Sequence, residues 1–177
     1  MRITAGELRG RVLNVPDEPG LRPTPAKVRQ ALFNILGSID EMRLLDLYSG
    51  SGVMALEAIS RGASALSIEQ NRRLTRDMEQ IRQQWHLADS WQIKTGTVER
   101  GLQALAGEHF DLIFADPPYR QSLAEKLPQW LDEQAIRCDL LVIEESAHVN
   151  PNWPEGWQCE QSRRYGDSTL HFLYRAS

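Results

Sequence analysis

The sequence has no long apolar run, few cysteines and no clustered histidines. No stretch approaches the roughly 20 apolar residues that a membrane-spanning helix needs, and no signal-peptide pattern opens the chain. The two cysteines, Cys138 and Cys159, have neither the spacing of a metal site nor the density of a disulfide framework. With a length that fits one domain, these absences predict a cytoplasmic protein without a membrane segment or a metal site.

An excess of positive charge is also absent, because the net charge is −4. The charge is unevenly distributed: the first 30 residues carry six basic and three acidic side chains, and the remainder carries 14 basic and 21 acidic ones. A basic arm on an acidic body steers phosphate backbones to one face of a protein. The alternative is a solvated arm whose charges have no partner. The basic residues of this arm are Arg2, Arg9, Arg11, Arg22, Lys27 and Arg29.

The first 37 residues predict a small extension made of a hairpin and a helix. Two short strands, 2–6 and 10–15, flank a glycine-bearing connection. Residues 16–25 are rich in proline and glycine, so we expect them to be irregular and exposed. Thr24 is a predicted helix N-cap, with Pro25 at the first helical position. Three cations near the helix start, Arg22, Lys27 and Arg29, are expected to point outward together.

From residue 42 onward, apolar strands alternate with helices. This order predicts an α/β fold with a doubly wound, Rossmann-like, mostly parallel sheet. Two alternating segments around Gly166-Asp167 predict an antiparallel hairpin at the end of the chain. We therefore expect one domain, 1–177, with an extension over 1–37 and a catalytic core over 42–177. The predicted strands are 42–48, 65–68, 91–94, 110–115, 140–144, 157–162 and 169–174.

A glycine loop, residues 49–52, joins the first core strand to a helix over 53–61. Glycines let a ligand approach the backbone, and the helix N-terminus offers free N–H groups. Glu69 ends the next strand, 19 positions beyond Gly50. That spacing is typical of a carboxylate that binds ribose hydroxyls. The alternative is an ordinary α/β turn followed by a strand-end glutamate.

A second loop, the Asp-Pro-Pro-Tyr loop (residues 116–119), follows the buried strand 110–115. The two prolines stop the strand and stiffen the backbone. Ligands of open α/β sheets bind beyond the carboxyl ends of the strands. A carboxylate, free carbonyls and a flat ring at such a point suit a planar substrate with an amino group. The alternative is a strand end with a surface tyrosine.

Together these two loops resemble those of class I S-adenosylmethionine-dependent methyltransferases that act on exocyclic amines. DNA and protein amine methyltransferases share both loops. Other segments narrow the resemblance to the bacterial 16S ribosomal RNA guanine-N2 methyltransferase family, over nearly the whole chain. These segments are 2–11, 21–24 followed by Arg29 and 32–34, 56–62 and 165–169.

The resemblance implies a role for each residue on the cofactor side. Gly50, Ser51 and Gly52 would pass close to the methionine part of S-adenosylmethionine. Asp46 would support that loop and the cofactor's amino group, and Glu69 would accept from the ribose hydroxyls. Further cofactor contacts would come from Tyr48, Gly96, Thr97 and Asp116.

The resemblance also implies how the target base is held. Asp116 and the carbonyl of Pro117 would accept hydrogen bonds from the guanine amino group, and Tyr119 would stack on the base. Two fixed acceptors orient the amine and aim its lone pair at the methyl group. A carboxylate there also stabilises the positive charge that develops on nitrogen.

One segment departs from the family pattern. After the third strand the family usually carries an acid or amide that contacts the adenine amino group, whereas this sequence reads Lys94-Thr95-Gly96-Thr97. Either the Thr97 hydroxyl or backbone groups then take that role. The implied partner is 16S rRNA, in the small subunit or an assembly intermediate, bound by a monomer. The phosphates of this rRNA would be bound by Arg2, Arg9, Arg11, Arg22 and Arg29.

Two other functions remain open. One is methylation of adenine N6 in DNA or of a glutamine side chain in a protein, although a DNA enzyme would need a target-recognition region for which this chain has no spare length. The other is a dinucleotide-dependent oxidoreductase or nucleotide-binding module, because Gly50-x-Gly52-x-x-Ala55 is compatible with a dinucleotide fingerprint. That second function leaves the Asp-Pro-Pro-Tyr loop unexplained.

Overall fold

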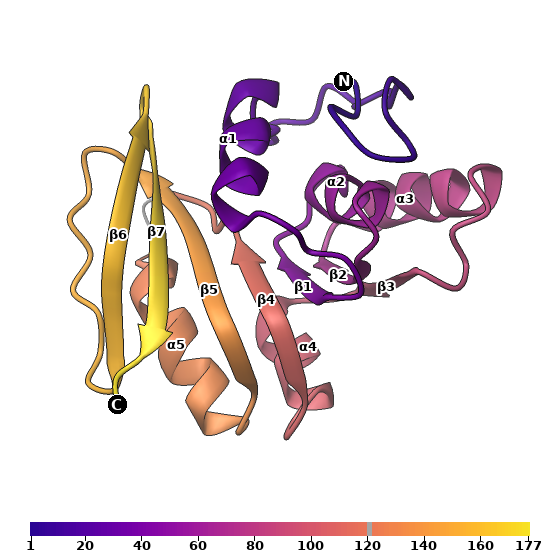
Figure 1. The fold of residues 1–177 in the computed structure, drawn as a ribbon. Coiled ribbons are helices and arrows are strands. Elements are labelled where there is room, and N and C mark those ends of the chain that lie inside the picture. The colour runs from indigo at the N-terminus through magenta and orange to yellow at the C-terminus, as the bar shows by residue number, and fades with distance from the viewer. Residues whose placement is uncertain (120–121) are drawn as a thin grey trace.

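A computed structural model describes residues 1–119 and 122–177. Within them, seven strands form one sheet in the order β3-β2-β1-β4-β5-β7-β6 (Figure 1). Strands β1 to β5 pair in parallel, and β7 runs antiparallel to both β5 and β6. The predicted sheet and its antiparallel hairpin are confirmed. The strands are β1 (Arg43–Leu47), β2 (Ser64–Glu69), β3 (Trp91–Thr95), β4 (His109–Ala115), β5 (Arg137–Ser146), β6 (Trp157–Tyr165) and β7 (Ser168–Arg175).

Helices cover both faces of the sheet, with α1, α2 and α3 on one side and α4 and α5 on the other (Figure 1). All eight residues of α2 are buried, because this helix lies between the sheet and the amino-terminal extension. No helix in the described part of the chain is long and apolar enough to cross a membrane. The helices are α1 (Ala26–Leu36), α2 (Val53–Ser60), α3 (Arg72–Gln84), α4 (Val98–Ala104) and α5 (Leu123–Glu133).

The amino-terminal extension differs from its prediction in its hairpin and in its helix cap. The expected hairpin is reduced to one antiparallel bridge, between Arg2 and Val12, because neighbouring backbone groups bond to α2 instead. The N–H groups of Glu7 and Leu8, for example, donate to the carbonyl and the hydroxyl of Ser60. The extension is therefore held mainly by its contacts with α2.

The predicted N-cap at Thr24 is wrong. Helix α1 begins at Ala26, so the N-cap position belongs to Pro25, which offers no side-chain cap. The Thr24 hydroxyl points elsewhere and donates to Oε2 of Glu144, at 3.1 Å. This hydroxyl therefore bonds to the buried carboxylate of Glu144 in β5 and not to the first N–H groups of α1. The extension is thereby attached to the carboxyl edge of the sheet.

The sheet changes winding direction between β1 and β4, which are neighbours although three helices and two strands separate them in sequence. At such a switch point the connections leave in opposite directions and open a crevice beyond the strand ends. Leu47 pairs with Ala115, so the residues that follow these strands lie side by side. The two predicted loops therefore meet at one place.

Candidate active site

A cavity of about 740 Å³ opens at this switch point. Its size is that of a site for a cofactor and part of a substrate. The glycine loop, the segment around Glu69, the turn before α4 and the Asp-Pro-Pro-Tyr loop form its floor and sides. The segment 18–24, here called the strap, forms one further wall.

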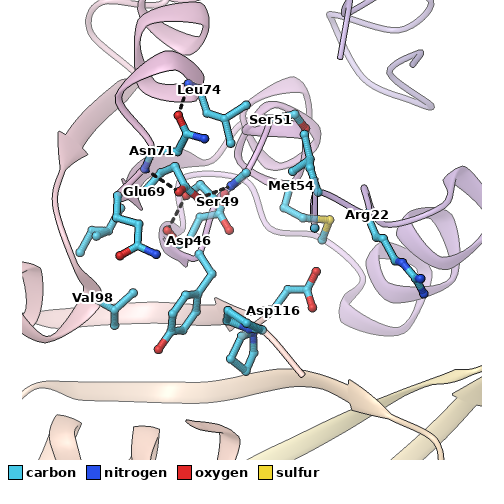
Figure 2. Close-up of a pocket in the computed structure, with 18 of the residues that line it drawn as sticks. Arg22, Asp46, Ser49, Ser51, Met54, Glu69, Asn71, Leu74, Val98 and Asp116 are labelled. Carbon is cyan, nitrogen blue, oxygen red and sulfur yellow. Dashed lines mark hydrogen bonds between the residues drawn. The ribbon is translucent and has the colours of Figure 1, made fainter. Parts of the chain in front are cut away.

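Glu69 connects the glycine loop to the start of α3 (Figure 2). Its Oε2 accepts from the N–H of Gly50 at 2.8 Å, and its Oε1 accepts from the N–H of Asn71 at 2.9 Å. Asn71 in turn caps α3 through its side-chain oxygen. An ionised carboxylate offers about four acceptor sites, so two remain for hydroxyls of a bound ligand.

The two glycines of the loop serve different purposes. Gly50 lines the cavity with φ +57°, and a Cβ there would lie 2.8 Å from the Leu21 side chain of the strap. Gly52 has φ +78° and faces the core, where a Cβ would lie 2.7 Å from the Trp91 ring and 2.8 Å from Met78 Sδ. Gly52 lies outside the cavity lining, so its cofactor contact remains a prediction. It is required for packing and for the left-handed turn.

Two buried polar atoms beside the glycine loop have no hydrogen-bond partner among the described residues. One is Oδ2 of Asp46, whose residue is 1% exposed; burial raises the pKa of this carboxyl to about 7. The other is the Tyr48 hydroxyl, whose pKa is also raised by burial. Tyr48 has a φ of +57°, a strained conformation that clusters at functional sites. Unsatisfied atoms and strain in one cavity wall indicate a ligand site.

All four residues of the Asp-Pro-Pro-Tyr loop line the cavity. Figure 2 shows the Asp116 carboxylate directed into the cavity. Burial, followed by the charges of Glu144, Asp46 and Glu145, raises the pKa of Asp116 well above its usual range. Tyr119 remains 37% exposed, and its hydroxyl lies 3.2 Å from Oγ of Ser168.

The strap was predicted to be irregular and exposed, and the exposure is confirmed only in part. It has no regular structure, and Pro19, Gly20 and Arg22 are exposed, but the segment lines the cavity and ends at the buried Thr24. Its other end is held by an ion pair between Glu18 and Arg73 of α3, at 2.7 Å. Irregular segments have no periodicity that predicts which residues they face, so the sequence contained no signal for this wall.

Arg29 is the one residue of the predicted RNA surface that the structure removes from it. The side chain is 1% exposed, and its Nε lies 3.0 Å from Oε1 of Glu57. It also donates to the carbonyls of Thr24 and Arg2. The prediction is wrong because Arg29 lies one turn before the buried Phe33, on the face of α1 that meets α2.

The other arm arginines, Arg2, Arg9, Arg11 and Arg22, are exposed. Arg22 lies at the rim of the cavity, and its side chain points away from Asp116 (Figure 2). The remaining three lie outside the cavity lining. The structure thus places the basic arm beside the cavity rather than inside it.

Several lining residues were not predicted, although they share a simple position. Each stands in the first turn of a helix that follows a strand of the sheet, where the side chain reaches the carboxyl edge. The apolar first-turn residues of the lining are Val53, Met54, Leu74, Val98 and Leu123. Thr97, which was predicted, also lines the cavity and caps α4 with its hydroxyl, which accepts from the N–H of Arg100 at 3.4 Å.

Comparison with known proteins agrees with this geometry. The family described as Conserved hypothetical protein 95 matches residues 1–174. The chain belongs to this family. Ribosomal RNA small subunit methyltransferase D of Escherichia coli (strain K12) is 32% identical over 180 residues, which cover 99% of this chain and 90% of that protein. The protein of the same name from Haemophilus influenzae is 30% identical and covers 94% and 89%.

Solved structures of relatives share the fold of this family member. The putative methyltransferase yhhF from Escherichia coli superposes with a TM-score of 0.86 at 32% identity, covering 99% of this chain and 97% of that one. A hypothetical protein from Thermus thermophilus has a TM-score of 0.83 at 30% identity, covering 99% of both chains. The family resemblance seen in the sequence is confirmed.

The residues of this family member fit S-adenosylmethionine. The unpartnered, buried Oδ2 of Asp46 suits an ammonium group, and Glu69 retains acceptor sites for ribose hydroxyls. Gly50 leaves space for close approach to the backbone. The apolar first-turn side chains supply a surface of the kind that holds a flat ring.

Proposed function

We propose that the protein transfers the methyl group of S-adenosylmethionine to the exocyclic N2 amine of a guanine in 16S ribosomal RNA. The observation that carries the proposal is the convergence of Glu69, Asp46 and the Asp-Pro-Pro-Tyr loop on one cavity at the switch point of the sheet. Curated relatives with the name Ribosomal RNA small subunit methyltransferase D support the substrate class.

The chain's own residues provide acceptors, a platform and an electrostatic environment. Asp116 and the Pro117 carbonyl accept from the amine hydrogens, and the nitrogen lone pair is then aimed at the electrophilic methyl group that the cofactor supplies. Tyr119 stacks on the base, which contributes roughly 1–3 kcal/mol. Asp116 stabilises the positive charge on the methylated nitrogen, and its raised pKa suits it to take the proton that nitrogen then loses.

The basic arm is the proposed RNA contact. In this proposal residues 1–37 form an extension on a core of residues 42–177, and a monomer binds the rRNA within the small subunit or an assembly intermediate. Replacement of Arg9, Arg11 and Arg22 by alanine should weaken binding and reduce the slope of log affinity against log salt by about 2, because each phosphate contact contributes about 0.7. Alanine at Arg100 of α4, Lys126 of α5 and Arg137 at the start of β5, three exposed cations outside the arm, is the matched control; an equal loss there would remove the arm from the proposal.

Methyl transfer to undermethylated bacterial small subunits tests the proposed function directly. Labelled S-adenosylmethionine is supplied, the labelled nucleoside is identified, and Asp116→Ala serves as the control. The expected product is N2-methylguanosine, absent with the variant. Absence of label in RNA, with S-adenosylhomocysteine binding intact, would favour a DNA or protein amine. Thermal stabilisation by NAD alone would favour the dinucleotide-dependent alternative.

A further inference from the structure

Glu144 is a buried carboxylate for which the proposed reaction has no use. It lies near the carboxyl end of β5 and is 4% exposed. Ile143 pairs with Ala115, so Glu144 lies beside Asp116 on the neighbouring strand. Its charge is, after burial, the largest cause of the raised pKa of Asp116. Glu144 is not among the residues that line the cavity, so its proposed role is indirect.

The first partner of Glu144 is Thr24, the last residue of the strap. The Thr24 hydroxyl donates to Oε2 of Glu144 at 3.1 Å, and the Thr24 carbonyl accepts from Nη1 of Arg29 at 2.6 Å. Arg29 itself is held by Glu57 of α2. The end of the strap is therefore fixed from two sides, by β5 and by the buried ion pair of the extension.

A second polar neighbour of Glu144 is Ser168, the first residue of β7. It pairs with Ser146, two positions beyond Glu144 in β5, so both side chains lie on the same face of the sheet. The Ser168 and Thr24 hydroxyls each offset part of the rise that burial causes in the pKa of Glu144. Ser168 also lies 3.2 Å from the hydroxyl of Tyr119. Glu144 therefore has the hydroxyl of the strap residue Thr24 on one side and Ser168, the contact of the Tyr119 hydroxyl, on the other.

We infer that Glu144 is a positioning residue for the target base, which holds the strap at Thr24 and the Tyr119 ring, through Ser168, in one arrangement around Asp116. This inference rests on the proposed function and extends it. Three chain segments far apart in sequence contribute to the base site, and one side chain sets their relative positions. The RNA-binding extension is thereby coupled to the site of methyl transfer.

Two substitutions at Glu144 separate geometry from charge. Glu144→Leu removes the acceptor of the Thr24 hydroxyl, so kcat/KM for RNA should fall about 10- to 100-fold, the usual effect of leaving a buried polar group unpaired. The affinity for S-adenosylhomocysteine should stay within twofold, because Glu144 lies away from the cofactor side of the cavity. Glu144→Gln keeps an oxygen acceptor for Thr24, so it should retain most of the activity at high pH.

Glu144→Gln should also move the acidic limb of the pH–rate profile to lower pH. Asp116 must be ionised to accept from the amine, and the like charge of Glu144 raises its pKa. Removing that charge lowers the pKa of Asp116, although burial and the charges of Asp46 and Glu145 remain. This shift measures the charge effect of Glu144 on Asp116, whereas the positioning role is measured by the kcat/KM of Glu144→Leu.

Thr24→Val and Ser168→Ala test these two contacts independently of the Glu144 variants. Each should reduce kcat/KM for RNA about fivefold, since Thr24→Val removes the bond to Glu144 and Ser168→Ala removes the contact with the Tyr119 hydroxyl. Thr24→Ser keeps the hydroxyl and should restore wild-type activity. Combined with Glu144→Leu, Thr24→Val should add little further loss, because its interaction is already absent.

The outcomes distinguish the two proposals. No N2-methylguanosine from the wild-type protein would refute both. A wild-type enzyme whose Glu144→Leu variant retains its kcat/KM for RNA within twofold would refute only the inference. If Glu144→Leu does not fold, Thr24→Val and Ser168→Ala decide, and wild-type activity of both overturns the inference. An equal loss of cofactor affinity in Glu144→Leu also overturns it, in favour of a general structural role.

Discussion

The buried ion pair of Arg29 and Glu57 yields the sharpest prediction for stability. Both side chains are at most 1% exposed, and their Nε and Oε1 atoms lie 3.0 Å apart. Glu57 also accepts from the N–H and hydroxyl of Thr4 and pairs with Arg61. Glu57→Gln preserves the shape but leaves the Arg29 guanidinium buried without a counter-charge.

The loss should be large relative to the stability of a domain of this size. Removing one partner of a buried ion pair costs about 3–5 kcal/mol. Typical domains unfold with about 5–15 kcal/mol, so this one substitution removes a substantial fraction. The three carbonyl and carboxylate contacts of Arg29 concentrate the effect on the extension, which carries the strap.

Urea unfolding followed by tryptophan fluorescence measures this loss. The matched control is Glu79→Gln, which removes the same charge from a partly exposed pair with Arg82 on α3. That control should lose at most about 1 kcal/mol, as partly solvated pairs do. Equal unfolding midpoints and slopes for the two variants would refute the argument that the Arg29–Glu57 pair holds the extension on the core.

Three further predictions follow from the cavity. First, methyl transfer should decline on acidification beginning at a higher pH than the usual range of an aspartate, because the pKa of Asp116 is raised and only its ionised form accepts from the amine; a flat pH–rate profile down to pH 5 would contradict this. Second, Asp46→Asn should stabilise the ligand-free protein at pH 8 by up to about 4 kcal/mol while weakening S-adenosylhomocysteine binding. The sign follows because the native pKa near 7 exceeds the unfolded value of 3.8, so ionisation destabilises the fold as pH rises between them. Thermal melts should show no such gain at pH 4, and a gain at both pH values would contradict the assignment. Third, Arg73→Ala should free one end of the strap by removing its pair with Glu18, and raise the dissociation constant of S-adenosylhomocysteine severalfold by calorimetry; unchanged affinity would show that the strap does not need this pair.

The sequence predicted those features that depend on local chemistry. Nearly continuous apolar runs identified β1, β2 and β4, because a buried parallel strand must be apolar. An acid ends β2 and another follows β4, where the chain reaches the edge of the sheet. Gly50 and the spacing to Glu69 predicted the loop that the carboxylate now binds at 2.8 Å. Proline pairs and glycine turns located the Asp-Pro-Pro-Tyr loop and the final hairpin, since both residues act on their own backbone.

Tertiary structure alone decided which polar groups meet. Arg29 was expected to face RNA, but its partner Glu57 stands 28 positions away; Thr24 was expected to cap a helix, but its partner Glu144 stands 120 positions away. Packing against Trp91 likewise determined the role of Gly52. The position of the strap as a cavity wall also depends on the assembled fold. Residue type and spacing determine which groups end each strand, whereas the winding of the sheet determines their neighbours. A buried charge or hydroxyl must find a partner somewhere, and only the assembled fold shows where.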